Sequence, residues 1–203
     1  MLLDVDVNTV SGRESGLRIA AKEGFVELLE FLLSQPKINV NIKVAGYYSN
    51  SGQWTPLIVA CFHGKHEIVK RLVTVANIDL THKDGWGRTA QYYAARGGHS
   101  ECVKALATVP SLDWNCRNNG GATPLYLALY NGRTECVRII ASLPGIDFAV
   151  KTDFGLILAE VAVNREKSNV ECVNILADIE AFNWNVDKNG DTPLMMTLKN
   201  GKK

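Results

Sequence analysis

The chain from Asn118 to Lys151 carries a pattern of polar and apolar positions that predicts two short helices. Thr123 and Pro124 suit the start of the first helix, because a threonine hydroxyl caps a free backbone N–H group and proline has no N–H to leave unpaired. Apolar residues three positions apart then give this helix one buried face, and Gly132 can end it in a left-handed conformation. The next apolar run predicts a second, longer helix with apolar positions at Cys136, Val137, Ile139, Ile140 and Leu143.

The same pattern recurs along most of the chain. Thr55, Thr89 and Thr123 stand at equal intervals, Ile157 and Thr192 continue the series, and Ser15 precedes it after a longer interval. A glutamate recurs at the expected start of the second helix, at Glu27, Glu67, Glu101, Glu135 and Glu171. An Asp or Asn follows each glutamate at one constant distance, at Asn39, Asp79, Asp113, Asp147 and Asn183. Self-similarity at a fixed period predicts a repeat solenoid, in which each unit contacts only its neighbours.

The Thr-Pro-Leu helix start at 123–125 and the Asn- and Gly-rich turn at 118–122 resemble the ankyrin repeat. The period of about 34 residues is also the length of a tetratricopeptide repeat, but the helix start and the turn before it favour ankyrin. The resemblance implies an all-α ankyrin-repeat solenoid of helix–loop–helix units joined by β-turn fingers. We expect a single domain over residues 1–203, with repeats near 11–43, 50–83, 84–117, 118–151 and 152–186 and a partial repeat at 187–203.

One long turn and the fifth repeat depart most from the pattern. The turn at 42–54 is about six residues longer than its neighbours, and its aromatics Tyr47, Tyr48 and Trp54 predict an extended, solvent-exposed finger. In the fifth repeat Ile157 replaces threonine, so the hydroxyl cap is missing, and 164–169 is longer than its counterparts and lacks glycine. We expect lower local stability there. Both ends of the chain look cut within a repeat.

Charge and cysteine content narrow the function classes. The formal net charge is +1 and the pI about 7.6, so no strong field recruits nucleic acid or an anionic membrane. No apolar stretch is long enough to span a bilayer, and Asp4 and Asp6 directly after the first three residues are unlike a signal peptide. The repeat places Cys102, Cys136 and Cys172 on successive outer helices, which pack about 8–10 Å apart, too far for a ladder of disulfides. We therefore expect reduced, packed thiols and an intracellular protein, cytoplasmic or nuclear.

The candidate chemical motifs are better explained by the repeat. Cys61, His63 and His66 form a C-x-H-x-x-H pattern, but no second ligand cluster accompanies it. The glycine-rich stretch 85–89 echoes a phosphate loop, although glycine recurs just before each threonine position and suits a turn. No nucleophile motif occurs, so we expect no catalytic residues, metal or cofactor. In ankyrin proteins the asparagines at the positions of Asn41, Asn115 and Asn185 can be hydroxylated, but we favour a role in bonding the turn backbone.

The resemblance implies partner binding by the finger tips and the concave face of the inner helices. Here these positions form what we call the predicted stripe: Trp54, Phe62, His63, Trp86, Arg88, Arg96, Asn119, Tyr130, Asn131, Phe154 and Leu156, with Tyr47 and Tyr48 on the long finger. Tryptophan, tyrosine and arginine dominate interface energetics. Packing of these aromatics between neighbouring fingers is the alternative explanation. The stripe suits an extended or helical partner segment with apolar and acidic character.

We therefore predict a monomeric, non-catalytic module that binds a protein partner. An alternative is the cytoplasmic ankyrin segment of a larger channel, signalling scaffold or ubiquitin-ligase adaptor. A hydrolase or transferase would instead require a deep cleft with convergent polar groups.

Overall fold

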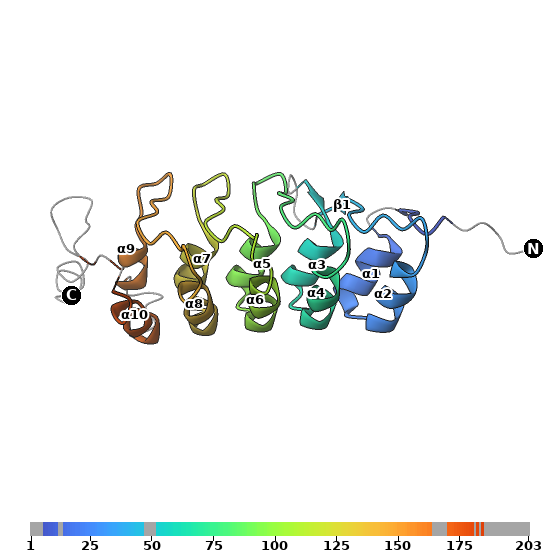
Figure 1. The fold of residues 1–203 in the computed structure, drawn as a ribbon. Coiled ribbons are helices and arrows are strands. Elements are labelled where there is room, and N and C mark those ends of the chain that lie inside the picture. Colours follow the sequence, from blue (N-terminus) through green and yellow to red (C-terminus); the bar gives the residue numbers. More distant parts are fainter. Residues whose placement is uncertain are drawn as a thin grey trace, which may run out of the picture.

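A computed structural model of the protein describes residues 6–11, 14–46, 52–163, 170–180, 182 and 184. Figure 1 shows a single row of helix pairs, with turns projecting from one side as fingers. The helices nearer the fingers, called inner helices, are α1 (Gly16–Glu23), α3 (Pro56–Phe62), α5 (Ala90–Gly97), α7 (Pro124–Tyr130) and α9 (Leu158–Val163). The outer helices are α2 (Val26–Leu33), α4 (His66–Leu72), α6 (Ser100–Ala107), α8 (Thr134–Ala141) and α10 (Val170–Ala177).

This architecture confirms the predicted all-α solenoid of helix–loop–helix units. Strands β1 (Val44–Ala45) and β2 (Gln53–Trp54) pair antiparallel in the second finger and form a small two-stranded sheet. None of the described helices is long and apolar enough to cross a membrane.

The helix starts follow the predicted capping. The hydroxyls of Ser15, Thr55, Thr89 and Thr123 accept hydrogen bonds from the N–H groups three positions on, at 3.2–3.4 Å. In the fifth repeat, where Ile157 has no hydroxyl, the chain uses the other half of a capping box. The Ile157 N–H donates to the Glu160 carboxylate at 3.0 Å.

The core lies between the inner and outer helices, and its composition repeats with the fold. Five positions after each cap stands an alanine, whose small side chain lets inner helices approach one another: Ala20, Ala60, Ala94, Ala128 and Ala162 are all at most 3% exposed. Five positions after each outer-helix glutamate stands a large aliphatic residue: Leu32, Leu72, Leu106, Ile140 and Leu176 are all buried. Cys102, Cys136 and Cys172 are also buried, as predicted, and all five cysteines are free.

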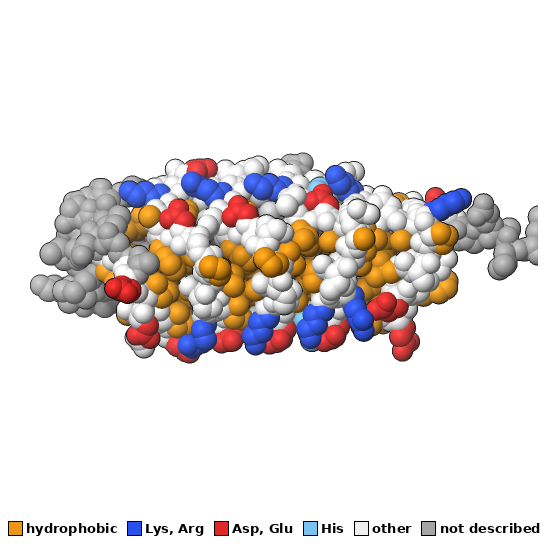
Figure 2. All heavy atoms as spheres, in the orientation of Figure 1, with side chains coloured by type: hydrophobic (Ala, Val, Ile, Leu, Met, Phe, Trp, Pro, Cys, Tyr) orange, Lys and Arg blue, Asp and Glu red, His pale blue; other side chains and the backbone are white. Residues whose placement is uncertain are grey.

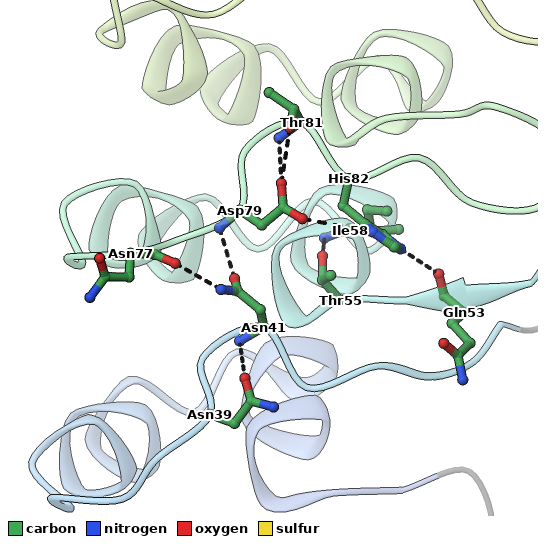
Figure 3. A network of polar contacts seen from close by, with 9 residues as sticks. All are labelled: Asn39, Asn41, Gln53, Thr55, Ile58, Asn77, Asp79, Thr81 and His82. Atoms are coloured by element: carbon green, nitrogen blue, oxygen red, sulfur yellow. Dashed lines mark hydrogen bonds and ion pairs between the residues drawn. The ribbon is translucent and has the colours of Figure 1, made fainter.

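Asparagine side chains link successive outer loops, the segments that lead from an outer helix to the next finger. Asn41 donates from Nδ2 to the carbonyl of Asn77 and accepts from the N–H of Asp79, at 2.7 and 2.8 Å (Figure 3). Asn8 and Asn115 make the same pair of bonds to the loops that follow them, at 2.7–2.9 Å. We call Asn8, Asn41 and Asn115 the asparagine ladder. Asn185, the other candidate at this position, lies outside the described residues.

Charged side chains gather along two edges of the molecule, with apolar side chains between them (Figure 2). Ion pairs cross from one outer helix to the next, including Glu30 with Arg71 at 3.1 Å and Arg138 with Glu171 at 2.7 Å. These side chains are exposed, so solvent and salt weaken the attraction. The repeat arrangement, rather than these pairs, holds the row together.

Candidate functional site

Trp54, which we predicted to lie on the surface stripe, is buried in the structure. The pairing of β1 with β2 turns the long connection back onto the helices and buries the Trp54 side chain completely, at 0% exposure. Its ring centroid lies 5.0 Å from that of Phe62 and 4.7 Å from that of Tyr93. The expectation of a surface tryptophan here was wrong, because strand pairing across a long turn is not visible in the local pattern. Tyr47 and Tyr48 lie outside the described residues.

The third finger is fixed to its own inner helix by a buried carboxylate. Asp84 accepts from the N–H groups of Trp86 and Arg88 at 2.9 and 3.0 Å, and from the Tyr93 hydroxyl at 2.5 Å. Burial and this bond to Asp84 raise the pKa of Tyr93, so the hydroxyl stays protonated and donates. The Arg88 guanidinium lies 3.7 Å from the centre of the Trp86 ring. A cation–π contact therefore orients both side chains at the base of the finger.

Neighbouring fingers are held in register by backbone hydrogen bonds. The Asn119 N–H donates to the carbonyl of Trp86 at 3.0 Å, and the Asp153 N–H donates to the carbonyl of Gly120 at 3.1 Å. The Asn119 side chain adds a bond to the carbonyl of Gly85 at 3.3 Å. Phe154, one finger further along, is 77% exposed. The finger residues of the stripe thus stand on a fixed scaffold.

The inner-helix residues of the stripe meet at a small cavity of about 210 Å³ where three inner helices end. Three predicted residues, Phe62, Arg96 and Asn131, line it together with residues that the pattern did not single out: Tyr93, Gly97 and Arg133. We call this the helix-end cavity. His63 lies beside it, with its ring 5.0 Å from that of Phe62. Tyr130 is 41% exposed and stacks on Tyr126 with centroids 6.1 Å apart.

Arg133 could have been found from the repeat. It follows Lys65 and His99 at the spacing of the repeat, so a basic side chain occupies the same loop position in three successive repeats. Each of these side chains lies across the loop glycine of the preceding repeat. A Cβ added to Gly98, which has φ +79°, would come within 2.7 Å of the Arg133 Cδ, so the close approach requires glycine there.

Basic groups dominate the electrostatics around the helix-end cavity. Burial lowers the pKa of His63, and the positive charges of Lys65, Lys22 and Arg18 lower it further. Burial also lowers the pKa of His99, and Arg133 adds to the effect, whereas the bond from His99 Nε2 to the Phe62 carbonyl at 3.2 Å opposes it. No carboxylate lines the cavity, and Arg96 forms no ion pair within the described part of the chain. The region is therefore electropositive.

Tyr93 connects the finger residues to the cavity. The Arg88 guanidinium lies 5.3 Å from the Tyr92 ring and 6.0 Å from the Tyr93 ring. The Tyr93 ring is in turn 5.6 Å from that of Phe62, which lines the cavity. Trp86, Arg88, Tyr93 and Phe62 thus form a continuous path of aromatic and cationic groups from finger to helix end.

The described residues contain no group of three His, Cys, Asp or Glu side chains placed to hold a metal ion. Cys61 is fully buried, whereas His66 is on the surface beside Glu67, at 3.2 Å. Burial raises the pKa of Cys61, raises that of Cys102 to about 12 and raises that of Cys136 to about 11, so these thiols stay protonated at neutral pH. Their chemistry is that of packed apolar groups.

A comparison with known families finds a match over most of the chain. A family model described as "Ankyrin repeats (3 copies)" matches residues 1–84 and 64–152 of the chain. No curated protein matches the chain.

Proposed function

Because the chain belongs to the ankyrin-repeat family, whose members are generic protein–protein interaction modules, we propose that it binds a segment of a partner protein along its fingers and inner-helix ends. The observation that carries this proposal is that the partly exposed Trp86, Arg88 and Phe62, which lead from the third finger to the helix-end cavity, are held together by the buried Tyr93. Aromatic and arginine side chains on a rigid base are the residue types that anchor interfaces.

The hydrogen bonds that fix this surface suit the docking of a partner. Asp84 fixes the base of one finger, and backbone bonds hold that finger to the next, so a partner would dock without first ordering the surface. The cavity of about 210 Å³ is smaller than the pockets, of roughly 300–1,000 Å³, that usually hold small-molecule substrates. The small cavity supports a non-catalytic module, and we propose that it is monomeric. Its five free cysteines suit a reducing, intracellular compartment.

The test is capture of a partner from native lysate by the wild-type chain and by variants, quantified by mass spectrometry. The double variant Trp86→Ala/Tyr130→Ala removes one finger anchor and one inner-helix anchor. Phe31→Ala is the matched control, because Phe31 is 62% exposed on outer helix α2, away from the fingers. Circular dichroism melts establish first that all variants fold.

A protein retained by the wild type and by Phe31→Ala, and lost by the double variant, supports the proposal. A protein retained equally by the wild type and both variants would place the interaction on another face. Loss from Phe31→Ala alone would assign binding to the first outer helix and would contradict the proposed surface.

A further inference from the structure

The helix-end cavity combines an aromatic floor with an arginine rim. We propose that it is a subsite for one carboxylate side chain of the partner, an Asp or Glu that lies next to an apolar residue. This assignment rests on the proposed function and names the chemistry of the segment that binds. The occupant is an acidic–apolar stretch of protein, rather than a basic or a neutral one.

Arg133 is held in place before any ligand arrives. Its Nε donates to the carbonyl of Arg96 at 3.3 Å, and its Cδ lies over Gly98, whose missing side chain makes room for it. Within the described part of the chain, the two terminal nitrogens of this guanidinium form no hydrogen bond or ion pair, so they can bind a ligand. Arg96 is exposed on the same rim. Guanidinium groups bind carboxylates through two parallel hydrogen bonds, which is why arginine is favoured where a carboxylate is recognised.

The floor of the cavity suits the apolar part of such a side chain and its neighbour. The Phe62 and Tyr93 rings meet edge to face with centroids 5.6 Å apart. The Tyr93 ring is only 2% exposed and its hydroxyl is bonded to Asp84, so the partly exposed Phe62 ring supplies most of the apolar surface. The volume of about 210 Å³ admits a single side chain and excludes a drug-sized ligand.

A competing effect comes from the helices themselves. The C-terminal end of a helix carries partial negative charge and attracts cations rather than anions. Here one carbonyl at the end of α3 and one at the end of α5 are each bonded by a side chain from the next repeat. His99 bonds the carbonyl of Phe62 at 3.2 Å, and Arg133 bonds that of Arg96 at 3.3 Å. In α7 the Leu127 carbonyl accepts from both the backbone N–H and the side chain of Asn131, at 3.0 and 2.8 Å.

With these acceptors satisfied, the positive side chains set the sign of the local field. The same field is felt by His63, which lies beside the cavity near Lys65, Lys22 and Arg18. Glu23 also lies near His63, but it pairs with Lys22 at 3.2 Å. The cavity therefore attracts an anionic side chain.

The experiment selects random peptides displayed on phage against the wild-type chain, Arg96→Ala and Lys37→Ala. Lys37→Ala removes the same charge from an exposed residue of the first outer loop and serves as the control. Arg96→Ala is the primary variant because Arg96 is exposed and forms no ion pair within the described residues, so its loss leaves the fold intact. A peptide enriched on the wild type is then synthesised with its Asp or Glu and with the matching Asn or Gln.

We expect wild type and Lys37→Ala to enrich peptides with Asp or Glu beside an aromatic or aliphatic residue, and Arg96→Ala to lose that preference. Neutralising the acidic residue should weaken binding to the wild type by about tenfold or more, and binding to Arg96→Ala by much less. Enrichment of peptides without an acidic residue, or equal weakening in both proteins, would overturn the carboxylate subsite. If those peptides still depended on Trp86 and Tyr130, the proposed function would stand while this assignment failed. Absence of any enriched peptide would also overturn the subsite.

Discussion

Replacing Asn41 by alanine tests whether the asparagine ladder couples successive repeats. The substitution removes two hydrogen bonds to the following outer loop, one to the carbonyl of Asn77 at 2.7 Å and one from the N–H of Asp79 at 2.8 Å (Figure 3). Each such bond contributes about 0.5–1.5 kcal/mol net, so the expected loss in the free energy of unfolding is about 1–3 kcal/mol. The bond from the Asn41 N–H to Asn39 is made by the backbone and survives.

Thr81 provides the matched control, because it occupies the corresponding position one repeat later. Its N–H and hydroxyl both donate to Asp79 of its own loop at 3.0 Å, and a threonine side chain lacks the second polar arm that reaches the next loop. Thr81→Ala should therefore cost less than Asn41→Ala. An asparagine at position 81 would reach Ser111 and Asp113, which stand at the same distances along the chain as the two partners of Asn115. Thr81→Asn should therefore stabilise the protein.

The measurement is urea unfolding followed by circular dichroism, with the midpoint and slope fitted for each variant. Stacked repeats are stabilised by their shared interfaces, so a lost link between neighbours shifts the midpoint of the array. The reasoning is refuted if Asn41→Ala destabilises no more than Thr81→Ala. It is also refuted if Thr81→Asn lowers the midpoint, because the bonds would then not be what connects the loops.

Further predictions concern backbone strain, protonation, the core and the thiols. Gly145→Ala should cost roughly 1–2 kcal/mol, because its φ of +74° disfavours a side chain in otherwise open space. In urea unfolding, Gly52→Ala should lower the free energy of unfolding by roughly 1–3 kcal/mol more than Gly145→Ala does. The added Cβ would lie 2.6 Å from the backbone nitrogen of Gly85. Burial keeps the pKa of His99 below its ordinary value of 6.5, so the unfolded chain binds the proton first. Stability should therefore fall as pH drops below about 6.5, and His99→Gln should flatten that slope; an unchanged slope would exclude His99 as the cause. Trp54→Ala should lower the free energy of unfolding by about 3–5 kcal/mol and lower the melting temperature. A melting temperature equal to that of the wild type would contradict the burial of Trp54. In the native protein a thiol reagent should reach the partly exposed Cys116 first and label the four buried cysteines slowly, whereas it should label the urea-unfolded protein fully. Fast native labelling of Cys61, Cys102, Cys136 or Cys172 would contradict their burial.

The sequence alone determined the repeat and its local architecture. Thr55, Thr89 and Thr123 cap their helices as predicted, because a cap is a contact between near neighbours in the chain and needs nothing from the rest of it. The burial of the outer-helix cysteines followed from apolar periodicity, which fixes the inward face of a helix. The repeat boundaries and the partner-binding residues remain predictions.

Only the tertiary structure decided which aromatic and charged residues share a surface. The sequence predicted Trp54 to be an exposed finger residue, but its pairing with Val44 across the long turn buries it in the core. Phe62, Arg96 and Arg133 come from three successive repeats and meet only when the helices stack. Burial depends on which neighbours stack against a side chain, and those neighbours lie a whole repeat away in the chain, beyond the range in which local hydrogen bonds and periodicity carry information.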